Sequence, residues 1–151
     1  MDTPFGNING PGIMCAEPHA VCDGDTFRVR WHPTCVIDER WRLADVDASG
    51  RGRTGWTAAT QALRDWLRHP YLTAEWAYDR PAARGHANRP LVYLWADGLL
   101  INEEIIRSGL TRVVRKHTDT RHWARCAEAE KAARTARIGI WQGNPPPIQS
   151  G

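Results

Sequence analysis

Three aspartates in two short runs are the residues of this sequence whose spacing best suits catalysis. Asp23 and Asp25 flank a glycine in the run DGDT (23–26), and Asp47 ends the run RLADVD (42–47). Carboxylate oxygens are the ligands that hard divalent cations such as Ca²⁺ and Mg²⁺ prefer. Taken alone, an Asp-Gly pair is more often simple turn chemistry than a metal site. Its interpretation therefore depends on the residues around it.

Two strands are expected to position these aspartates. Residues 26–31 alternate between apolar and polar side chains, which is the period of a half-buried strand. Residues 32–34 interrupt this run, and a second strand from about 36 to 46 follows, so the pair predicts a hairpin. Arg42 points away from the face that holds Trp41 and Leu43, and Asp45 is expected to be a polar strand residue.

The remaining pattern predicts three helices and two further strands. A Gly-rich basic loop after Asp47 leads to a helix from Thr54, a fair N-cap, to about residue 68. The other expected elements are strands at 71–78 and 91–96, a short helix from about 100 that ends at Ser108-Gly109, and a last helix at 119–137 capped by Thr118. Strands and helices without β-α-β alternation predict an α+β fold with a largely antiparallel sheet.

Length and composition favour a single domain. The 151 residues are enough for one hydrophobic core, and 42% hydrophobic with 25% charged residues is ordinary for a globular protein. Residues 1–12 are rich in Gly, Asn and Pro and predict a flexible leader, while residues 143–151 predict a disordered tail. The folded domain is expected at 13–142. A net charge of +3 fits a polyanionic partner without requiring one.

The sequence predicts the cellular location only conditionally. The first residues have neither the basic start nor the apolar run of a signal peptide, and no stretch has the composition of a membrane span. We expect a cytoplasmic protein if the N-terminus is complete, and a secreted or periplasmic one if it was trimmed. The four cysteines lack the spacing of a zinc site, so reduced thiols are favoured over a disulfide.

Five runs in a fixed order make the sequence similar to a known family. They are VCDGDT (21–26), RLADVD (42–47), RPLVYLWADG (89–98), INEEIIRSGL (101–110) and GIW (139–141). In this order they resemble the staphylococcal nuclease (thermonuclease) family over about residues 13–142. The resemblance implies a five-stranded OB-type β-barrel, mostly antiparallel and in Greek-key order, with three α-helices. It also implies Ca²⁺-dependent hydrolysis of DNA and RNA phosphodiesters, and we expect a monomer without membrane contact.

The resemblance assigns roles to residues of this chain. Asp25 and Asp47 would bind the metal ion, joined by the backbone carbonyl of Ala48, and Asp23 would support them. Arg42 and Arg89 fall where the family places two arginines that grip the scissile phosphate. A guanidinium suits this task because it can bond two phosphate oxygens and stabilise the charge that grows in the transition state.

Other side chains could also contact a nucleic acid. Arg51 and Arg53 lie in the loop after Asp47, and Arg84 lies in the polar loop before Arg89. Scattered surface arginines commonly serve solubility, but here we favour phosphate contact. The eight tryptophans could include a base-stacking platform, although most are expected in the core.

Two positions depart from the family pattern. Gly50 stands where the family has the glutamate assigned as general base, and losing such a base typically lowers the rate about 10²–10⁴-fold. Residues 87–88 (Ala-Asn) replace a Tyr-Gly pair before Arg89, which makes Arg84 an alternative for its role. The sequence therefore predicts a metal-dependent nuclease of reduced activity. The alternative is a catalytically inactive OB-type module that binds nucleic acid or a protein partner.

Overall fold

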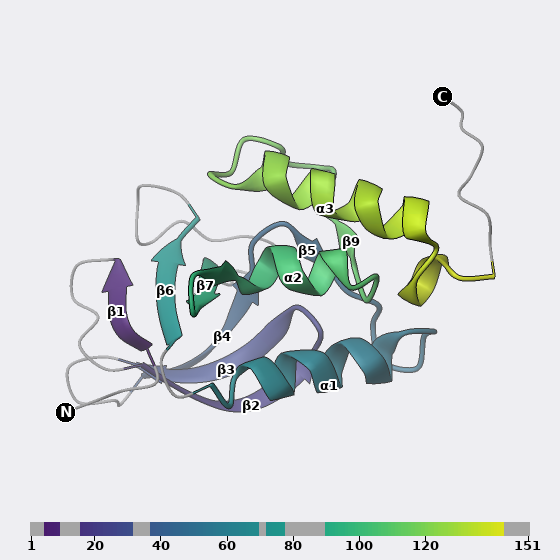
Figure 1. The fold of residues 1–151 in the computed structure, drawn as a ribbon. Coiled ribbons are helices and arrows are strands. Elements are labelled where there is room, and N and C mark those ends of the chain that lie inside the picture. The colour runs from purple at the N-terminus through teal and green to yellow at the C-terminus, as the bar shows by residue number, and fades with distance from the viewer. Residues whose placement is uncertain (1–4, 10–15, 32–36, 70–71, 78–89, 144–151) are drawn as a thin grey trace.

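The computed structural model of this chain describes residues 5–9, 16–31, 37–69, 72–77 and 90–143 (Figure 1). The strands in these residues are β1 (Phe5–Asn9), β2 (Ala16–Asp23), β3 (Thr26–Trp31), β4 (Ile37–Leu43), β5 (Val46–Asp47), β6 (Leu72–Trp76), β7 (Leu91–Ala96), β8 (Leu99–Leu100) and β9 (Arg112–Val113). The helices are α1 (Trp56–Trp66), α2 (Ile101–Arg107) and α3 (Trp123–Ala136), and a 3-10 turn follows at Gly139–Trp141. Within this part of the chain, no helix has the length and apolar character needed to pass through a bilayer.

Most strands belong to one sheet. This main sheet has seven strands, ordered β1-β6-β7-β4-β3-β2, with β8 added beside β7. Its neighbours run antiparallel except for β1–β6 and β4–β7, which are parallel. A separate antiparallel ladder pairs β5 with β9. The predicted α+β class, with three helices and a mostly antiparallel sheet, is confirmed.

The resemblance implies a five-stranded OB-type barrel, and the described strands do not form a closed barrel. No pairing in these residues joins β2, at one edge of the main sheet, to β1, at the other. The chain turns sharply after β4, where Asp45 has a φ of 70°, and β5 leaves the main sheet to pair with β9. This turn also ends the expected strand at Leu43 rather than at residue 46.

Strand β3 shows the predicted alternation. Phe27 and Val29 are fully buried, whereas Arg28 is half-buried and Arg30 is exposed. The predicted antiparallel pairing with β4 is confirmed, and it places Phe27 opposite Trp41. The strands expected at 71–78 and 91–96 correspond to β6 and β7.

Tryptophans fill much of the core. The ring centroids of Trp41 and Trp76 lie 5.3 Å apart, and Phe27 meets Trp41 edge-on at 6.3 Å. α1 packs on β2, while α2 packs on β7 and on α3 (Figure 1). Trp141 is buried as well, and three further tryptophans are partly buried against the core, namely Trp66, Trp95 and Trp123. The expectation that most tryptophans are core residues is therefore confirmed.

Two helix starts differ from the sequence expectation. Thr54 does not cap α1, which begins after Gly55 in the left-handed conformation at a φ of 90°. α3 begins at Trp123 rather than at residue 119. The reason for the later start is tertiary, because the Thr120 hydroxyl is bonded to the Asp45 carboxylate and the segment before α3 is held there.

A glycine closes α2 as predicted. Gly109 has a φ of 79°. A Cβ atom at this position would lie 2.4 Å from the carbonyl oxygen of Ile138, and the carbonyl oxygen of Gly109 accepts a hydrogen bond from the Ile140 N–H at 2.7 Å. The 3-10 turn therefore packs directly on the end of α2.

The ends of the chain and the cysteines are described in part. Phe5–Asn9, within the segment for which composition predicts a leader, forms β1 and pairs with β6. The domain limits 13–142 stay a prediction, and most of the predicted tail, residues 144–151, lies outside the described residues. Cys22 and Cys126 are free thiols, as predicted, whereas Cys15 and Cys35 lie outside the described residues.

Candidate active site

The Asp25 carboxylate lies at the centre of the candidate site. Gly24 and Asp25 form the two-residue turn between β2 and β3. Asp25 is only 4% exposed. Its Oδ1 accepts a hydrogen bond from the Thr26 hydroxyl at 2.7 Å, and its Oδ2 accepts one from the Ala48 N–H at 2.9 Å. Because Ala48 directly follows Asp47, this contact brings the two aspartate runs together.

Glycine is required in this turn. A Cβ atom at position 24 would lie 2.5 Å from the Cβ of Ala59 and 3.0 Å from the Cβ of Ala48. The turn is therefore pressed against α1 and the loop after β5. The carbonyl oxygen of Asp25 also accepts a hydrogen bond from the Leu43 N–H at 2.8 Å, which ties the turn to the end of β4.

Arg42 lies between the two aspartates. It comes from β4, and its Nη2 is 3.3 Å from Oδ2 of Asp25 and 3.9 Å from Oδ1 of Asp47. The same nitrogen donates to the Val46 carbonyl at 3.2 Å. The Arg42 side chain is largely buried, whereas that of Asp47 is 59% exposed. A guanidinium has five N–H donors, so Arg42 keeps donors for a further acceptor.

Asp23 supports the same turn. Its Oδ1 accepts a hydrogen bond from the Asp25 N–H at 3.3 Å. Burial raises the pKa of Asp23 to about 6, and the neighbouring Asp25 carboxylate is the next cause of that rise, through a side-chain hydrogen bond and its charge. Two carboxylates this close repel each other when both are ionised, and a proton or a cation relieves that repulsion.

The oxygen donors of this site suit a hard divalent cation. Within the described ranges, no group of three or more His, Cys, Asp and Glu side chains is arranged to hold a metal ion. Asp25 and Asp47 nevertheless both reach one nitrogen of Arg42, so two carboxylates converge on one region. Ca²⁺ and Mg²⁺ need no third side chain there, since carbonyl, water and phosphate oxygens can complete the shell. The residues present therefore fit such an ion by their chemistry.

The two arginines of the polar loop, Arg84 and Arg89, lie outside the described residues. Pro90, the residue after Arg89, accepts a hydrogen bond from the Arg42 N–H through its carbonyl at 2.9 Å. The chain thus enters β7 beside Arg42. The proposed pairing of Arg42 and Arg89 in phosphate binding stays a prediction.

The loop between β5 and α1 carries the other positions singled out from the sequence. Arg51 and Arg53 are both exposed, and the Arg51 guanidinium lies 5.5 Å from the ring centroid of Trp56. The carbonyl oxygen of Gly50 accepts a hydrogen bond from the Arg53 N–H at 3.0 Å, so the loop begins with a turn. Both arginines are open to solvent close in sequence to Asp47, and their contact with phosphate stays a prediction.

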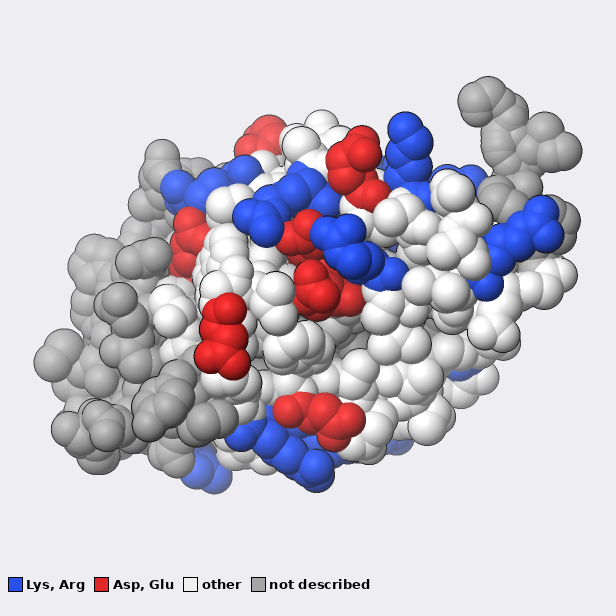
Figure 2. All heavy atoms as spheres, in the orientation of Figure 1, with Lys and Arg blue, Asp and Glu red and all other residues white. Residues whose placement is uncertain are grey.

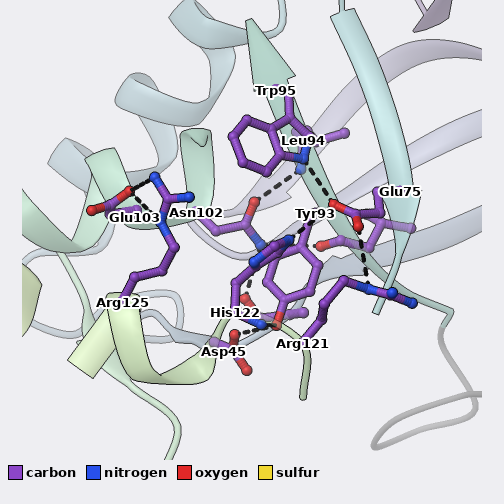
Figure 3. Close-up of polar contacts among 12 residues, drawn as sticks. Asp45, Glu75, Tyr93, Leu94, Trp95, Asn102, Glu103, Arg121, His122 and Arg125 are labelled. Atoms are coloured by element: carbon purple, nitrogen blue, oxygen red, sulfur yellow. Dashed lines mark hydrogen bonds and ion pairs between the residues drawn. The ribbon is translucent and has the colours of Figure 1, made fainter. Parts of the chain in front are cut away.

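A buried polar cluster, which the sequence did not predict, lies behind β5. Asp45 is in a turn rather than in a strand and is 5% exposed. Its Oδ2 accepts a hydrogen bond from the Tyr93 hydroxyl at 2.5 Å (Figure 3), and its Oδ1 accepts one from the Thr120 hydroxyl. The Tyr93 oxygen in turn accepts the His122 N–H at 3.0 Å. Burial raises the pKa of Asp45 and also that of Tyr93.

The cluster extends from Tyr93 and His122 to β6. Glu75 Oε1 lies 3.0 Å from Nε2 of His122 and accepts a hydrogen bond from the Trp95 indole N–H at 3.0 Å (Figure 3). Arg121 Nε lies 3.2 Å from the other Glu75 oxygen. These contacts fix the segment before α3 against β6 and β7. Through Asp45 they also fix the turn that leads into β5 and Asp47.

Asn102 holds the same turn from the side of α2. Its side chain is fully buried. Its Oδ1 accepts a hydrogen bond from the Leu94 N–H at 2.9 Å, and its Nδ2 donates to the carbonyls of Ala44 at 2.9 Å and Val92 at 3.1 Å. One amide thus joins α2, β7 and the residue before Asp45. Only the tertiary structure identifies this role, since an Asn early in a helix gives no such signal in the sequence.

The converging carboxylates and guanidinium form the candidate site of a mostly antiparallel α+β domain. The family model described as staphylococcal nuclease homologue matches residues 40–143, more than half of the chain. The chain belongs to this family and carries a nuclease-like domain. A search of curated proteins gave no match. Arg42 and Asp47 lie in the matched residues, whereas Asp25 precedes them and joins the site through its contacts with Ala48 and Arg42.

Proposed function

We propose that this protein hydrolyses phosphodiester bonds of DNA or RNA with a bound divalent cation, and that this cation is Ca²⁺. The observation that carries the proposal is the convergence of Asp25, Arg42 and Asp47 on one region. Phosphoryl transfer needs such an arrangement, because negative charge spreads over the phosphate oxygens in the transition state. Membership of the staphylococcal nuclease family supports the same chemistry.

Each residue has a separate task in this proposal. Asp25 and Asp47 would hold the cation, together with the Ala48 carbonyl, and the Thr26 hydroxyl keeps Asp25 in position. When bound, the cation supplies positive charge beside the scissile phosphate. Arg42 donates hydrogen bonds to the phosphate oxygens and stabilises their growing charge.

The attacking nucleophile is a water molecule, and the oxygen of the departing nucleotide leaves from the opposite side of the phosphorus. Gly50 has no side chain that could take the proton of this water. A positioned base contributes about 10²–10⁴-fold to such rates. We therefore propose slow turnover rather than none, because Arg42 acts on the phosphate, and Asp25 and Asp47 would hold the cation, independently of the base.

Gly50 also favours a second candidate function. A domain that keeps its phosphate-binding arginine but has no general base would bind nucleic acid without cleaving it, or would bind a protein partner. Binding and catalysis use partly separate residues, so the first can persist without the second.

A nuclease assay separates the two functions. Labelled DNA and RNA oligonucleotides are incubated with the purified protein in millimolar Ca²⁺ or Mn²⁺, with EDTA as the control. We expect slow cleavage that EDTA abolishes. A folded protein that binds both oligonucleotides and cleaves neither would establish the binding module instead. One that neither binds nor cleaves them would refute both the nuclease and a module that binds nucleic acid.

Two variants and one control variant test whether the activity lies at this site. Asp25→Asn should abolish cleavage, while Asp65→Asn, an exposed carboxylate on α1, should leave it unchanged. Arg42→Lys keeps the charge but loses the planar fork, so cleavage should fall about 10²–10³-fold. Thermal unfolding of each variant checks that the protein still folds.

A further inference from the structure

Positive charge is concentrated in one segment of this chain. Residues 112–137 contain eight Lys and Arg against three Asp and Glu, a net charge of +5, although the whole chain has a net charge of only +3. The rest of the chain, with 12 basic and 14 acidic residues, is therefore slightly negative. On the face shown in Figure 2, basic side chains gather along the α3 side, with acidic ones between them. An asymmetry of this kind is typical of contact with a polyanion.

The segment begins beside the candidate active site. Arg112 on β9 is the direct partner of Asp47 on β5 in the antiparallel ladder. Side chains of directly opposed residues lie on the same face of such a pair, and both of these are exposed. The Arg112 guanidinium lies 5.1 Å from the ring centroid of Trp141. The Arg134 guanidinium of α3 lies 5.0 Å from the centroid of the same ring.

From Arg134 the positive charges continue into a groove along α3. The groove has a volume of about 440 Å³, and Arg115, Lys131 and Arg134 are among the residues that line it. Two acidic residues also line it. Glu128 is exposed, whereas the Glu130 side chain is 3% exposed and its carboxylate is occupied by the Val113 N–H at 2.9 Å and by Arg115. Glu130 thus holds the arginine in position rather than repelling an anion. Lys131 is exposed and has no ion-pair partner among the described residues.

We propose that these residues, called here the basic groove (Arg112, Arg115, Lys131 and Arg134), bind the sugar-phosphate backbone of the same nucleic-acid strand whose scissile phosphate lies at Arg42. The inference rests on the proposed function, and it adds a second contact region that begins at Arg112, beside Asp47. Arginines that pair with a carboxylate or stack on a ring keep N–H donors for phosphate oxygens. The groove reads no base, so its contribution is independent of sequence and depends on strand length and salt.

Length-dependent binding in EDTA tests this inference without cleavage. Fluorescence anisotropy compares single-stranded oligonucleotides of about 5 and about 15 nucleotides, which lie near the two ends of the range of site sizes of single-strand binding domains. The variant Arg115→Gln/Lys131→Gln removes two charges from the basic groove. Its matched control, Arg64→Gln/Arg68→Gln, removes two exposed charges from α1 and the turn that follows it.

The loss of two phosphate contacts should make the plot of log K, the binding constant, against log salt concentration less steep by about 1.4, because each contact with a single strand contributes about 0.7 to the steepness. If the contribution of these two contacts vanishes near 1 M salt, the longer oligonucleotide should bind the double variant about 25-fold more weakly than the wild type at about 0.1 M salt. The shorter oligonucleotide should lose little affinity with either variant. The single variant Lys131→Glu, at an exposed position, gives the same comparison if the double variant does not fold.

The outcomes distinguish this inference from the proposed function. The basic groove would be overturned if the groove and control variants changed the affinity for the longer oligonucleotide equally, or if the wild-type affinity did not rise with oligonucleotide length. The proposed nuclease would stand in either case if the protein still cleaves in Ca²⁺. A protein that cleaves nothing in Ca²⁺ but binds with the expected length and salt dependence would overturn the nuclease and keep the basic groove.

Discussion

A side chain at position 50 would enter open space next to the candidate active site. Gly50 lies in the loop that follows Asp47, and a Cβ atom built there meets no other atom within 4 Å. The backbone at this position is outside the left-handed region, so a residue with a side chain adopts it without strain. We therefore expect Gly50→Glu to fold normally, with a change in stability within about 1 kcal/mol.

The expected gain in rate follows from the task of the missing carboxylate. A positioned general base contributes about 10²–10⁴-fold. Position 50 is exposed and its neighbours leave the new side chain free to move, so we expect the lower end, about 10²-fold, or about 2.7 kcal/mol off the barrier. Asp25, Arg42 and Asp47 remain unchanged in this variant, and the gain requires all three.

The assay measures initial cleavage rates of a labelled oligonucleotide in Ca²⁺ at several pH values. Gly50→Gln is the matched control, since it has the shape of the glutamate but cannot accept a proton as a carboxylate does. We expect the glutamate variant to gain activity with rising pH as its carboxyl ionises, and the glutamine variant to stay near the wild type. Equal rates for all three proteins, with unchanged binding of the oligonucleotide, would refute the reasoning and show that the carboxylates and Arg42 do not form a working centre.

Three further predictions concern buried groups. Asn102→Leu leaves buried backbone groups without their hydrogen-bond partner, which costs about 1–3 kcal/mol for each group. Urea unfolding should therefore show that the free energy of unfolding falls by about 3 kcal/mol or more. A fall below about 1 kcal/mol would contradict the role of Asn102 in this network. Burial raises the pKa of Asp45 above its ordinary 3.8, so the folded state keeps this proton up to a higher pH than the unfolded state does. The free energy of unfolding should therefore fall as pH rises from the unfolded-state pKa to the folded-state pKa of Asp45. Asp45→Asn should flatten this pH dependence. Burial also raises the pKa of the Cys126 thiol, so iodoacetamide should label Cys126 at pH 8 only after unfolding, and rapid labelling of the native protein would contradict its buried position.

The elements with a local pattern could be predicted from the sequence. The alternation at 26–31 and the apolar run at 91–96 gave β3 and β7, because side chains that alternate in character occupy the two faces of a strand in turn. The left-handed Gly109 was also predictable from its place after an apolar helix. The start of α3 was not, because a contact with Asp45, 75 residues away from Thr120, decides it.

The candidate site was predicted from the family resemblance more than from spacing. No local rule relates Asp25 to Asp47, and the contacts that join them run through Ala48 and Arg42. The Asp45 cluster left no signal in the sequence, because Tyr93 lies 48 residues further along the chain. The pairing of β5 with β9 rather than with the main sheet could not be predicted either, since it depends on residues far apart in the chain.

The short strand β5 has a consequence for when the proposed activity can arise during synthesis. Asp47 belongs to a strand of only two residues. Its described partner strand is β9, in which Arg112 follows Asp47 by 65 positions. At a synthesis rate of about 5–20 residues per second, about 3–13 s separate the appearance of Asp47 from that of Arg112. A growing chain therefore contains every carboxylate of the site for seconds before the ladder that holds Asp47 can form. We expect ribosome-bound chains that end before β9 to be inert toward RNA, and competence to appear only after β9 is available.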